Sequence, residues 1–195
     1  DGDYWKPVQT GIAEGDSDSE TVRRLSGFPG DRFHAPTYAL QAPLSPQAAA
    51  QHEGVRITIA GFSLPQSSRP MVVEGAGGVL APLGEGLVMA ELIAHLGLSV
   101  VLVARTALGT INHSLLSLEA LRSRGLEVAG MVFCGPPDAS NRKAVEQFGV
   151  VPTLGEVPLL DPLDAGAIAT LANNTPPCFA EARHMVAGST GTAHG

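Results

Sequence analysis

The sequence predicts an α/β fold with a mostly parallel sheet that is covered by helices on both faces. Three observations support this prediction: short apolar runs recur along the chain, segments with helical periodicity separate them, and glycines stand at many of the junctions. Strands of a parallel sheet are buried on both faces and are therefore apolar throughout, rather than alternating. The apolar runs have this character, so a parallel arrangement is favoured over antiparallel hairpins.

Composition limits the class of protein. The chain has 195 residues, 44% of them hydrophobic, which suffices for one core, so one domain is expected over residues 1–172, followed by a loose tail or linker over residues 173–195. A net charge of −7 with scattered basic residues argues against nucleic acid as a partner. The longest apolar stretch, residues 98–104, is far shorter than the roughly 20 residues of a membrane span.

Cysteine usage bears on the compartment. The only two cysteines, Cys134 and Cys178, form neither a disulfide framework nor a metal-binding spacing. Both thiols are therefore expected to be free, and the protein is expected to be cytoplasmic.

The sequence before residue 70 predicts few helices or strands. Ser17 and Glu20 have the spacing of a capping box, which predicts a short helix that starts near Ser17 and ends at Gly27. Residues 28–69 are rich in proline and predict only an alanine-rich helix near residues 47–52. Residues 70–74 then predict a buried strand that enters a glycine turn.

The rest of the chain alternates between helices and strands. Residues 105–110 are expected to form a loop in this part. Apolar periodicity predicts helices over residues 86–97, 111–125, 141–148 and 162–171, and strands over residues 98–104, 126–133 and 150–158.

Two charged side chains stand at strand ends, where parallel sheets bind ligands. Glu74 ends the predicted strand and precedes three glycines in four residues, so it is a candidate for holding a magnesium ion while backbone N–H groups approach phosphate. Lys6 ends a brief apolar segment and is placed to meet an anion, although a solvated surface lysine is the alternative. Asp18 lies in the first turn of a predicted helix. The helix dipole favours an acidic side chain there, which is the alternative explanation for this residue.

The loop over residues 106–113 precedes an amphipathic helix, so its N–H groups make a candidate anion site. Asn112 and His113 alternatively serve as helix caps. His113 has no second ligand at metal-binding spacing, and the chain contains neither G-x-S-x-G nor G-x-x-x-x-G-K-[ST]. Zinc, serine-hydrolase and Walker-type sites are therefore not predicted within these residues.

Five segments, in this order and spacing, resemble the dethiobiotin synthetases. They are YWKPVQTG at residues 4–11, DSD at 16–18, VEGAGG at 73–78, LGTINH at 108–113 and LGEVP at 154–158. The resemblance runs from residue 4 to about residue 171 and implies a P-loop NTPase-like fold. It also implies an ATP- and magnesium-dependent ligase of biotin biosynthesis.

The resemblance implies a reaction. In this family 7,8-diaminononanoate takes up carbon dioxide as a carbamate, ATP phosphorylates the carbamate to a carbamic–phosphoric anhydride, and the second amine closes the ring. Carried over, Lys6 and Thr10 are the catalytic residues: Lys6 neutralises the carbamate and the transferring phosphate, and Thr10 hydrogen-bonds the carbamate. Asp18 and Glu74 would hold Mg²⁺ and contact the nucleotide.

The remaining site residues also follow from the resemblance. A homodimer is implied, because the family binds the remote carboxylate of the substrate across a dimer interface. The substrate-binding residues would be Thr10, Gly78, Leu108, Gly109, Thr110, Ile111 and Asn112. The nucleotide-binding residues would be Asp18, Glu74, Gly75, Ala76, Gly77, Cys134, Glu156, Val157 and Pro158.

Two departures from the family pattern matter. Cys134 stands where the family has an asparagine that contacts adenine, and a thiol lacks the paired donor and acceptor of an amide. The family also begins with a strand, a Walker-type loop and a helix, about 30 residues, which are absent here. The absence of that central strand exposes edges on both of its neighbours.

Three interpretations follow. The chain is most of a dethiobiotin synthetase whose 195 residues alone are not expected to turn over ATP efficiently, or a noncatalytic remnant that binds substrate or a partner without phosphoryl transfer. The third is a related P-loop synthetase that forms amides.

Overall fold

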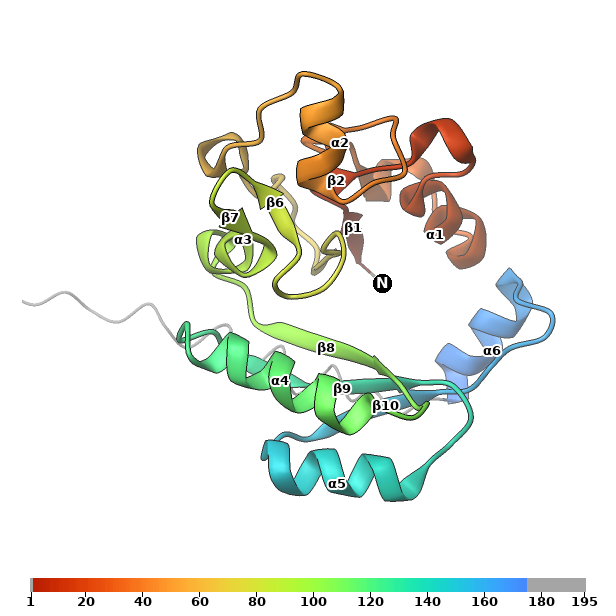
Figure 1. The fold of residues 1–195 in the computed structure, drawn as a ribbon. Helices are drawn as coiled ribbons and strands as arrows, with labels where there is room; N and C mark the ends of the chain where they lie inside the picture. The colour runs from red at the N-terminus through yellow and green to blue at the C-terminus, as the bar shows by residue number, and fades with distance from the viewer. Residues whose placement is uncertain (1, 175–195) are drawn as a thin grey trace, which may run out of the picture. The chain divides into compact units, whose positions relative to one another are not determined.

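The computed structural model describes residues 2–174, and the chain divides into two compact units, residues 1–98 and the residues from Ser99 onward (Figure 1). The α-helices are α1 (Asp18–Ser26), α2 (Pro46–His52), α3 (Met89–Leu96), α4 (Thr110–Arg122), α5 (Ala139–Gly149) and α6 (Ala165–Asn174). The strands are β1 (Asp3–Trp5), β2 (Val8–Gln9), β3 (Phe33–His34), β4 (Tyr38–Ala39), β5 (Met71–Val73), β6 (Pro82–Gly84), β7 (Leu87–Val88), β8 (Val100–Arg105), β9 (Val128–Cys134) and β10 (Thr153–Val157). Short 3₁₀ helices are η1 (Ile12–Glu14), η2 (Gly30–Arg32) and η3 (Ile59–Gly61).

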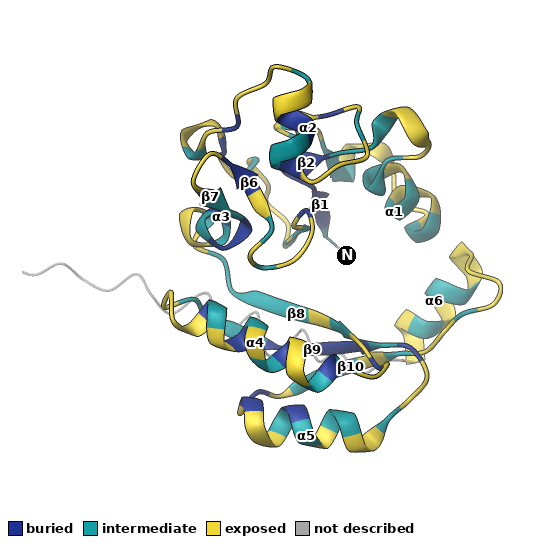
Figure 2. Cartoon of the chain, viewed as in Figure 1, coloured by how far each residue is buried: buried dark blue, intermediate teal, exposed yellow. Residues whose placement is uncertain are grey.

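The first unit is built around a parallel sheet of order β3-β1-β5. The central strand β1 is buried along its whole length, as the dark blue in Figure 2 shows. A second parallel pair, β2 with β4, and an antiparallel pair, β6 with β7, complete the unit's strands. The core of this unit is aliphatic, with Phe62 as a buried aromatic, and includes Val8, Leu40, Ala49, Leu83, Met89 and Leu92.

The second unit has a parallel sheet of order β10-β9-β8. Helix α4 packs on β8, on β9 and on α5, and Figure 1 shows α4 and α5 on the same side of this sheet. Met131 and Phe133, two residues apart in β9, point to one face and join the buried core with Leu118 and Val145. The predicted α/β class with parallel strands is confirmed.

The start of α1 follows from its sequence. The Ser17 side chain accepts the Glu20 N–H at 3.2 Å, and the Glu20 carboxylate accepts the Ser17 N–H at 2.8 Å. Gly27 ends the helix with a φ of 68°. The predicted capping box and glycine stop are both confirmed.

Several predicted boundaries are wrong. The predicted helix over residues 86–97 begins only at Met89, because Leu87 and Val88 pair with β6 across a turn at Gly86, whose φ is 67°. The last helix is displaced towards the carboxyl end and runs through Asn174, so residues 173 and 174 are helical. The remainder of the predicted tail lies outside the described residues.

The predicted burial of the strands over residues 70–74 and 98–104 is also wrong. Within residues 2–174, β5 and β8 each pair with a neighbour on one side only. The side chains of Val72 in β5 and Val103 in β8 are 65% and 62% exposed.

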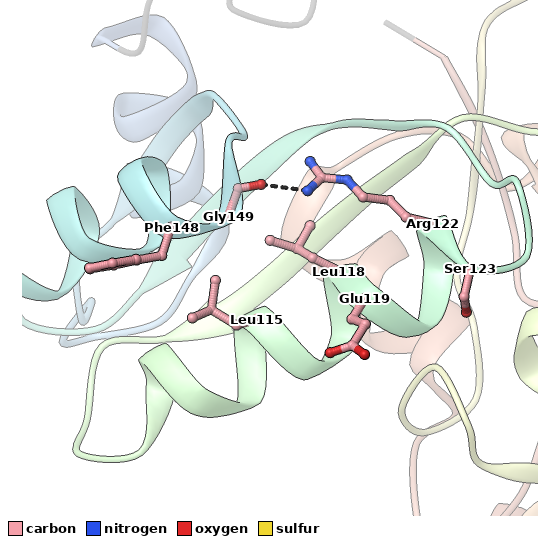
Figure 3. A pocket seen from close by; sticks show the side chains of 7 residues that line it. All are labelled: Leu115, Leu118, Glu119, Arg122, Ser123, Phe148 and Gly149. Carbon is pink, nitrogen blue, oxygen red and sulfur yellow. Dashed lines mark hydrogen bonds between the residues drawn. The ribbon is translucent and has the colours of Figure 1, made fainter.

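The junction between α5 and β10 contains a strained residue. Val150 has a φ of 45°, the one positive φ of a non-glycine residue among those described. The Arg122 guanidinium donates to the carbonyl oxygens of Gly149 at 2.6 Å and of Val150 at 2.9 Å, and Figure 3 shows the first of these bonds. The two guanidinium N–H groups of Arg122 therefore hold the strained turn against α4.

No helix among the described residues combines the length and the apolar character that a membrane crossing requires.

Candidate functional site

Lys6, Asp18 and Glu74 meet in the first unit. Lys6 follows β1, Asp18 opens α1, and Glu74 follows β5, which pairs with β1 in parallel. The Lys6 ammonium lies 2.5 Å from Asp18 Oδ2 and 2.8 Å from Glu74 Oε1, and it donates to the Gly75 carbonyl oxygen at 3.4 Å. Three segments that are distant in the sequence therefore converge on one ammonium.

Lys6 is not the solvated surface lysine of the alternative interpretation. Its side chain is only 8% exposed, whereas those of Asp18 and Glu74 are 47% and 42% exposed. Burial lowers the pKa of Lys6, but the bonds to Asp18 and Glu74 outweigh burial and hold the pKa above its usual value. The residue stays protonated, and its charge is shared between two half-exposed carboxylates.

A cleft of about 460 Å³ opens beside this cluster. The Gly11 N–H donates to the Ala42 carbonyl oxygen at 3.0 Å, which ties the proline-rich segment after residue 42 to one wall. The cleft is lined by Lys6, Gln9, Thr10, Asp16, Asp18, Leu44, Ser45, Pro46, Ala76, Gly77 and Ala81. The structure thus brings together Lys6, Thr10, Asp18, Ala76 and Gly77, all of which the resemblance had suggested.

The glycine turn after Glu74 reaches the cleft through Ala76 and Gly77. Gly77 has a φ of 80°, which favours glycine, and a Cβ there would lie 3.0 Å from that of Ala81, so Ala81 would have to shift slightly. Gly75 contributes its carbonyl oxygen to Lys6, while Gly78 does not line the cleft.

Sequence reasoning missed the supporting roles of Gln9 and Tyr4. The buried Gln9 amide accepts the Asp18 N–H at 3.1 Å and donates to the Thr10 carbonyl oxygen at 2.8 Å, so one side chain braces two candidate residues. The Tyr4 hydroxyl donates to Glu74 Oε2 at 2.7 Å. Burial, together with this bond to Glu74, raises the pKa of Tyr4 well above its usual value, so the hydroxyl keeps its proton. Residues two apart in a strand share a face, and this periodicity could have predicted that Tyr4 lies on the same side as Lys6.

The donor set fits a magnesium ion. Asp18 and Glu74 direct oxygen atoms at one point, where the Lys6 ammonium lies as a cation. Among the described residues no group of three or more His, Cys, Asp or Glu side chains gathers for a metal. Mg²⁺ is commonly bound by one or two carboxylates, with water and substrate phosphates completing its shell. Asp18 and Glu74 supply that number of carboxylates and are therefore candidate ligands.

The predicted substrate loop lies in the second unit, before α4. Gly109 is the N-cap of α4, with a φ of 93° and no side-chain cap, so the capping alternative for Asn112 and His113 is wrong. Leu108 is 97% exposed, whereas Thr110 is buried and its hydroxyl has no hydrogen-bond partner in the described part of the chain. Helix α4 thus starts without a side-chain cap beside an exposed loop, and the anion site at its start stays a prediction.

The predicted adenine-contacting residues stand at the ends of β9 and β10. Cys134 pairs in register with Val157, and the Gly135 N–H donates to the Val157 carbonyl oxygen at 2.9 Å. Cys134 carries a free thiol, and burial raises its pKa. The Glu156 carboxylate lies 3.6 Å from Arg142 Nε, a contact that sequence reasoning did not anticipate. Pro158 follows the strand and is exposed.

A second hollow, of about 540 Å³, lies between α4 and α5 (Figure 3). Sequence reasoning assigned none of its residues a function. Its lining is Leu115, Leu118, Glu119, Arg122, Ser123, Phe148 and Gly149. Arg122 is engaged by the backbone turn at Val150, so this hollow contains no cluster comparable to that of Lys6.

The chain is similar to one protein family and to several named proteins. Residues 1–167 match the family model described as an AAA domain (AAA_26). The chain is 52% identical over 174 residues to the biotin biosynthesis bifunctional protein BioCD of Bordetella avium, covering 89% of this chain and 37% of that protein.

Two further relatives are shorter proteins. The ATP-dependent dethiobiotin synthetase BioD of Rhizorhabdus wittichii is 50% identical over 169 residues, covering 87% of this chain and 80% of the relative. The ATP-dependent dethiobiotin synthetase BioD of Paramagnetospirillum magneticum is 46% identical over 177 residues, covering 91% of this chain and 83% of the relative. The match therefore spans most of these two relatives but little more than a third of the bifunctional one.

Proposed function

Because this chain belongs to the ATP-dependent dethiobiotin synthetase family, we propose that it catalyses the ATP-dependent closure of 7,8-diaminononanoate and carbon dioxide to dethiobiotin. One amine and carbon dioxide form a carbamate and release a proton. The γ-phosphoryl group of ATP passes to a carbamate oxygen, which gives a carbamic–phosphoric anhydride and ADP. The second amine attacks the carbamate carbon and loses a proton, phosphate leaves, and the cyclic urea closes.

The convergence of Lys6, Asp18 and Glu74 is the observation that carries this proposal. A buried ammonium beside a cleft offers a fixed positive charge, and fixed charge stabilises the developing negative charge of a carbamate and a transferring phosphate. Thr10 lines the same cleft, with its carbonyl oxygen held by Gln9, and donates its hydroxyl to the carbamate. These two residues are the proposed catalytic groups.

Asp18 and Glu74 are the proposed magnesium ligands. A bound Mg²⁺ neutralises charge on the phosphates during transfer. The chain's own contribution is to hold two carboxylates at one point and to present the turn of Gly75, Ala76 and Gly77, whose backbone lies at the cleft.

The second unit supplies the remaining proposed contacts. The loop from Leu108 to Asn112 binds the substrate, and Cys134 with residues 156–158 contacts the base of ATP. Gly78, in the first unit, is a separately proposed substrate contact. The uncapped start of α4 and the register of β9 with β10 support these assignments. A homodimer and a cytoplasmic location complete the proposal, and the free thiol of Cys134 is compatible with a reducing compartment.

One observation favours a second candidate, the binding of diaminononanoate without phosphoryl transfer. Lys6 and the turn of Gly75, Ala76 and Gly77 are the proposed phosphate contacts among the described residues, and the same cleft holds Thr10, the proposed carbamate contact. Binding needs only the carbamate and carboxylate sites, whereas transfer needs all phosphate contacts.

The experiment separates the two. The chain is incubated with diaminononanoate, bicarbonate, ATP and Mg²⁺, while phosphate release and dethiobiotin are measured, and calorimetry measures diaminononanoate binding in parallel. Phosphate release that depends on both diaminononanoate and bicarbonate, with dethiobiotin as product, supports the synthetase. Binding with no phosphate release supports the second candidate, and neither binding nor release overturns both.

A further inference from the structure

Tyr4 is a buried polar residue to which neither the resemblance nor the proposed chemistry gives a role. It lies in the central strand β1 and is 6% exposed, with its ring 5.8 Å from that of Phe33. Ring packing explains why an aromatic residue stands there, but it does not explain the hydroxyl. The hydroxyl donates to Glu74 Oε2 at 2.7 Å, from the next strand of the sheet.

The sheet register explains how the hydroxyl reaches Glu74. Tyr4 pairs with Val72 and Trp5 with Val73, and the Glu74 N–H continues the ladder to the Trp5 carbonyl oxygen at 2.9 Å. Side chains two residues apart in a strand share a face, so Tyr4 and Lys6 both project to the side on which Glu74 lies. Glu74 is thus approached by one donor from directly across and by another from a diagonal position.

These two donors hold different oxygen atoms. Oε1 receives the Lys6 ammonium at 2.8 Å, and Oε2 receives the Tyr4 hydroxyl. The Glu74 side chain is 42% exposed, so packing alone does not fix the plane of its carboxylate. Asp18 contacts the same ammonium, which makes Oε1 the Glu74 oxygen that faces the point of convergence.

We propose that Tyr4 is a positioning residue that fixes the carboxylate of Glu74, so that Oε1 stays directed at the point shared with Asp18 and Lys6. The proposal rests on the proposed function, because it assigns Glu74 to the divalent cation. Tyr4 does not touch substrate in this scheme. It acts by restricting rotation of the carboxylate, which lowers the entropy that a bound cation would otherwise have to remove.

The informative variant is Tyr4→Phe, which keeps the buried ring and removes only the hydroxyl. Tyr38→Phe is the matched control: the Tyr38 ring also packs on a phenylalanine, Phe62, at 5.2 Å, and its hydroxyl accepts the Thr58 N–H at 3.3 Å, away from the cluster. Glu74→Gln serves as the reference for loss of a cation ligand. Each variant is first compared with the wild-type chain by thermal unfolding, because only folded variants inform on binding.

The measurement is Mn²⁺ binding to the full chain, followed by the decrease of the free-ion signal in electron paramagnetic resonance. Loss of one hydrogen bond to a charged group predicts about a tenfold weaker Mn²⁺ affinity in Tyr4→Phe. The affinity of Tyr38→Phe stays within about twofold of wild type, and Glu74→Gln binds at least as weakly as Tyr4→Phe.

Two results would overturn the proposal: a Tyr4→Phe affinity equal to that of Tyr38→Phe, or no Mn²⁺ binding by the wild-type chain. The proposed function is judged separately, by dethiobiotin formation. If the wild-type chain makes dethiobiotin but Tyr4→Phe binds Mn²⁺ normally, only the assignment of Tyr4 fails. If Tyr4→Phe weakens Mn²⁺ binding but the wild-type chain makes no dethiobiotin, the synthetase function fails and the positioning role stands.

Discussion

Replacing Lys6 with methionine separates the catalytic from the structural value of the buried ammonium. Methionine keeps an unbranched apolar stem of similar length and removes the charge, so the space beside the cleft stays filled. The change deletes the contacts of Nζ with Asp18, Glu74 and the Gly75 carbonyl oxygen at 2.5, 2.8 and 3.4 Å. It also relieves the desolvation of a lysine whose side chain is 8% exposed.

The expected stability loss is small. Hydrogen bonds to charged groups contribute about 1.5–3 kcal/mol each when well shielded. Asp18 and Glu74, however, are 47% and 42% exposed, and ion pairs with exposed partners contribute only about 0–1 kcal/mol. We expect the free energy of unfolding to fall by about 1–2 kcal/mol.

The expected activity loss is much larger. Removing one group that stabilises a developing negative charge typically lowers kcat about 10²- to 10³-fold, or roughly 2.7–4 kcal/mol in the barrier. Urea denaturation measures the free energy of unfolding. Phosphate release in the presence of diaminononanoate and bicarbonate measures kcat. Lys143→Met is the matched control, since Lys143 is the chain's other lysine and is exposed on α5.

The pH dependence gives a further check on the same variant. The pKa of Lys6 is raised above its usual 10.5, so its stabilising contribution is complete below about pH 10.5 and is lost as the pH rises through the higher folded-state value. The stability difference between wild type and Lys6→Met should therefore be constant near neutrality and shrink in strong alkali. Unchanged turnover, or an unfolding free energy lowered by more than about 4 kcal/mol, would refute the reasoning, because Lys6 would then be structural.

Three further predictions concern other parts of the chain. Leu118→Ala removes a side chain that is 1% exposed and should cost about 2–5 kcal/mol in urea denaturation, whereas Leu116→Ala, at a position 55% exposed, should cost under about 1 kcal/mol; equal costs would contradict the described core. The hydrogen bond from Ser67, against the opposing effect of burial, lowers the pKa of Asp3 below its usual 3.8, so its contribution to stability is present above about pH 3.8 and is lost as the pH falls through the lower folded-state value. Thermal unfolding between about pH 2 and 6 should show a larger acid dependence in wild type than in Asp3→Asn, which keeps the contribution of Glu20, and parallel curves would contradict the prediction. Cys134→Asn supplies a paired donor and acceptor and should raise the preference for ATP over GTP by about tenfold in competition against a fluorescent ATP analogue, whereas an unchanged ratio would place residue 134 away from the base.

Local signals predicted the parts of the fold that depend on nearby residues. The Ser17 cap and Gly27 stop of α1 are set within one helical turn at each end, and both were predicted correctly. The start of α3 was not, because Leu87 and Val88 have the apolar character of either a helix or a strand, and pairing with β6 decided between them. The burial of β5 was predicted wrongly for the same reason. Val72 is as apolar as a residue of a central strand, and only the order of strands in the sheet places it at an edge.

The candidate site shows the same division. Glu74 was identified because it stands at a strand end before a glycine turn, whereas the roles of Lys6 and Asp18 came from the resemblance to the family. Their mutual contact was not predictable from spacing, because it depends on β1 and β5 being neighbours across about 70 residues of chain. Gln9 was missed because its amide acts on the backbone of Asp18, and a side chain that bonds backbone leaves no signature in residue type.

The turn at Val150 has an evolutionary consequence. A β-branched residue at a φ of 45° is costly, and the two hydrogen bonds from Arg122 offset part of that cost. The two positions are therefore not free to vary independently. A lineage that first replaces Val150 with glycine relieves the backbone and can then lose Arg122 cheaply, whereas the reverse order passes through a less stable intermediate. Relatives should accordingly retain the arginine wherever a branched residue follows α5, and should dispense with it most readily where glycine does.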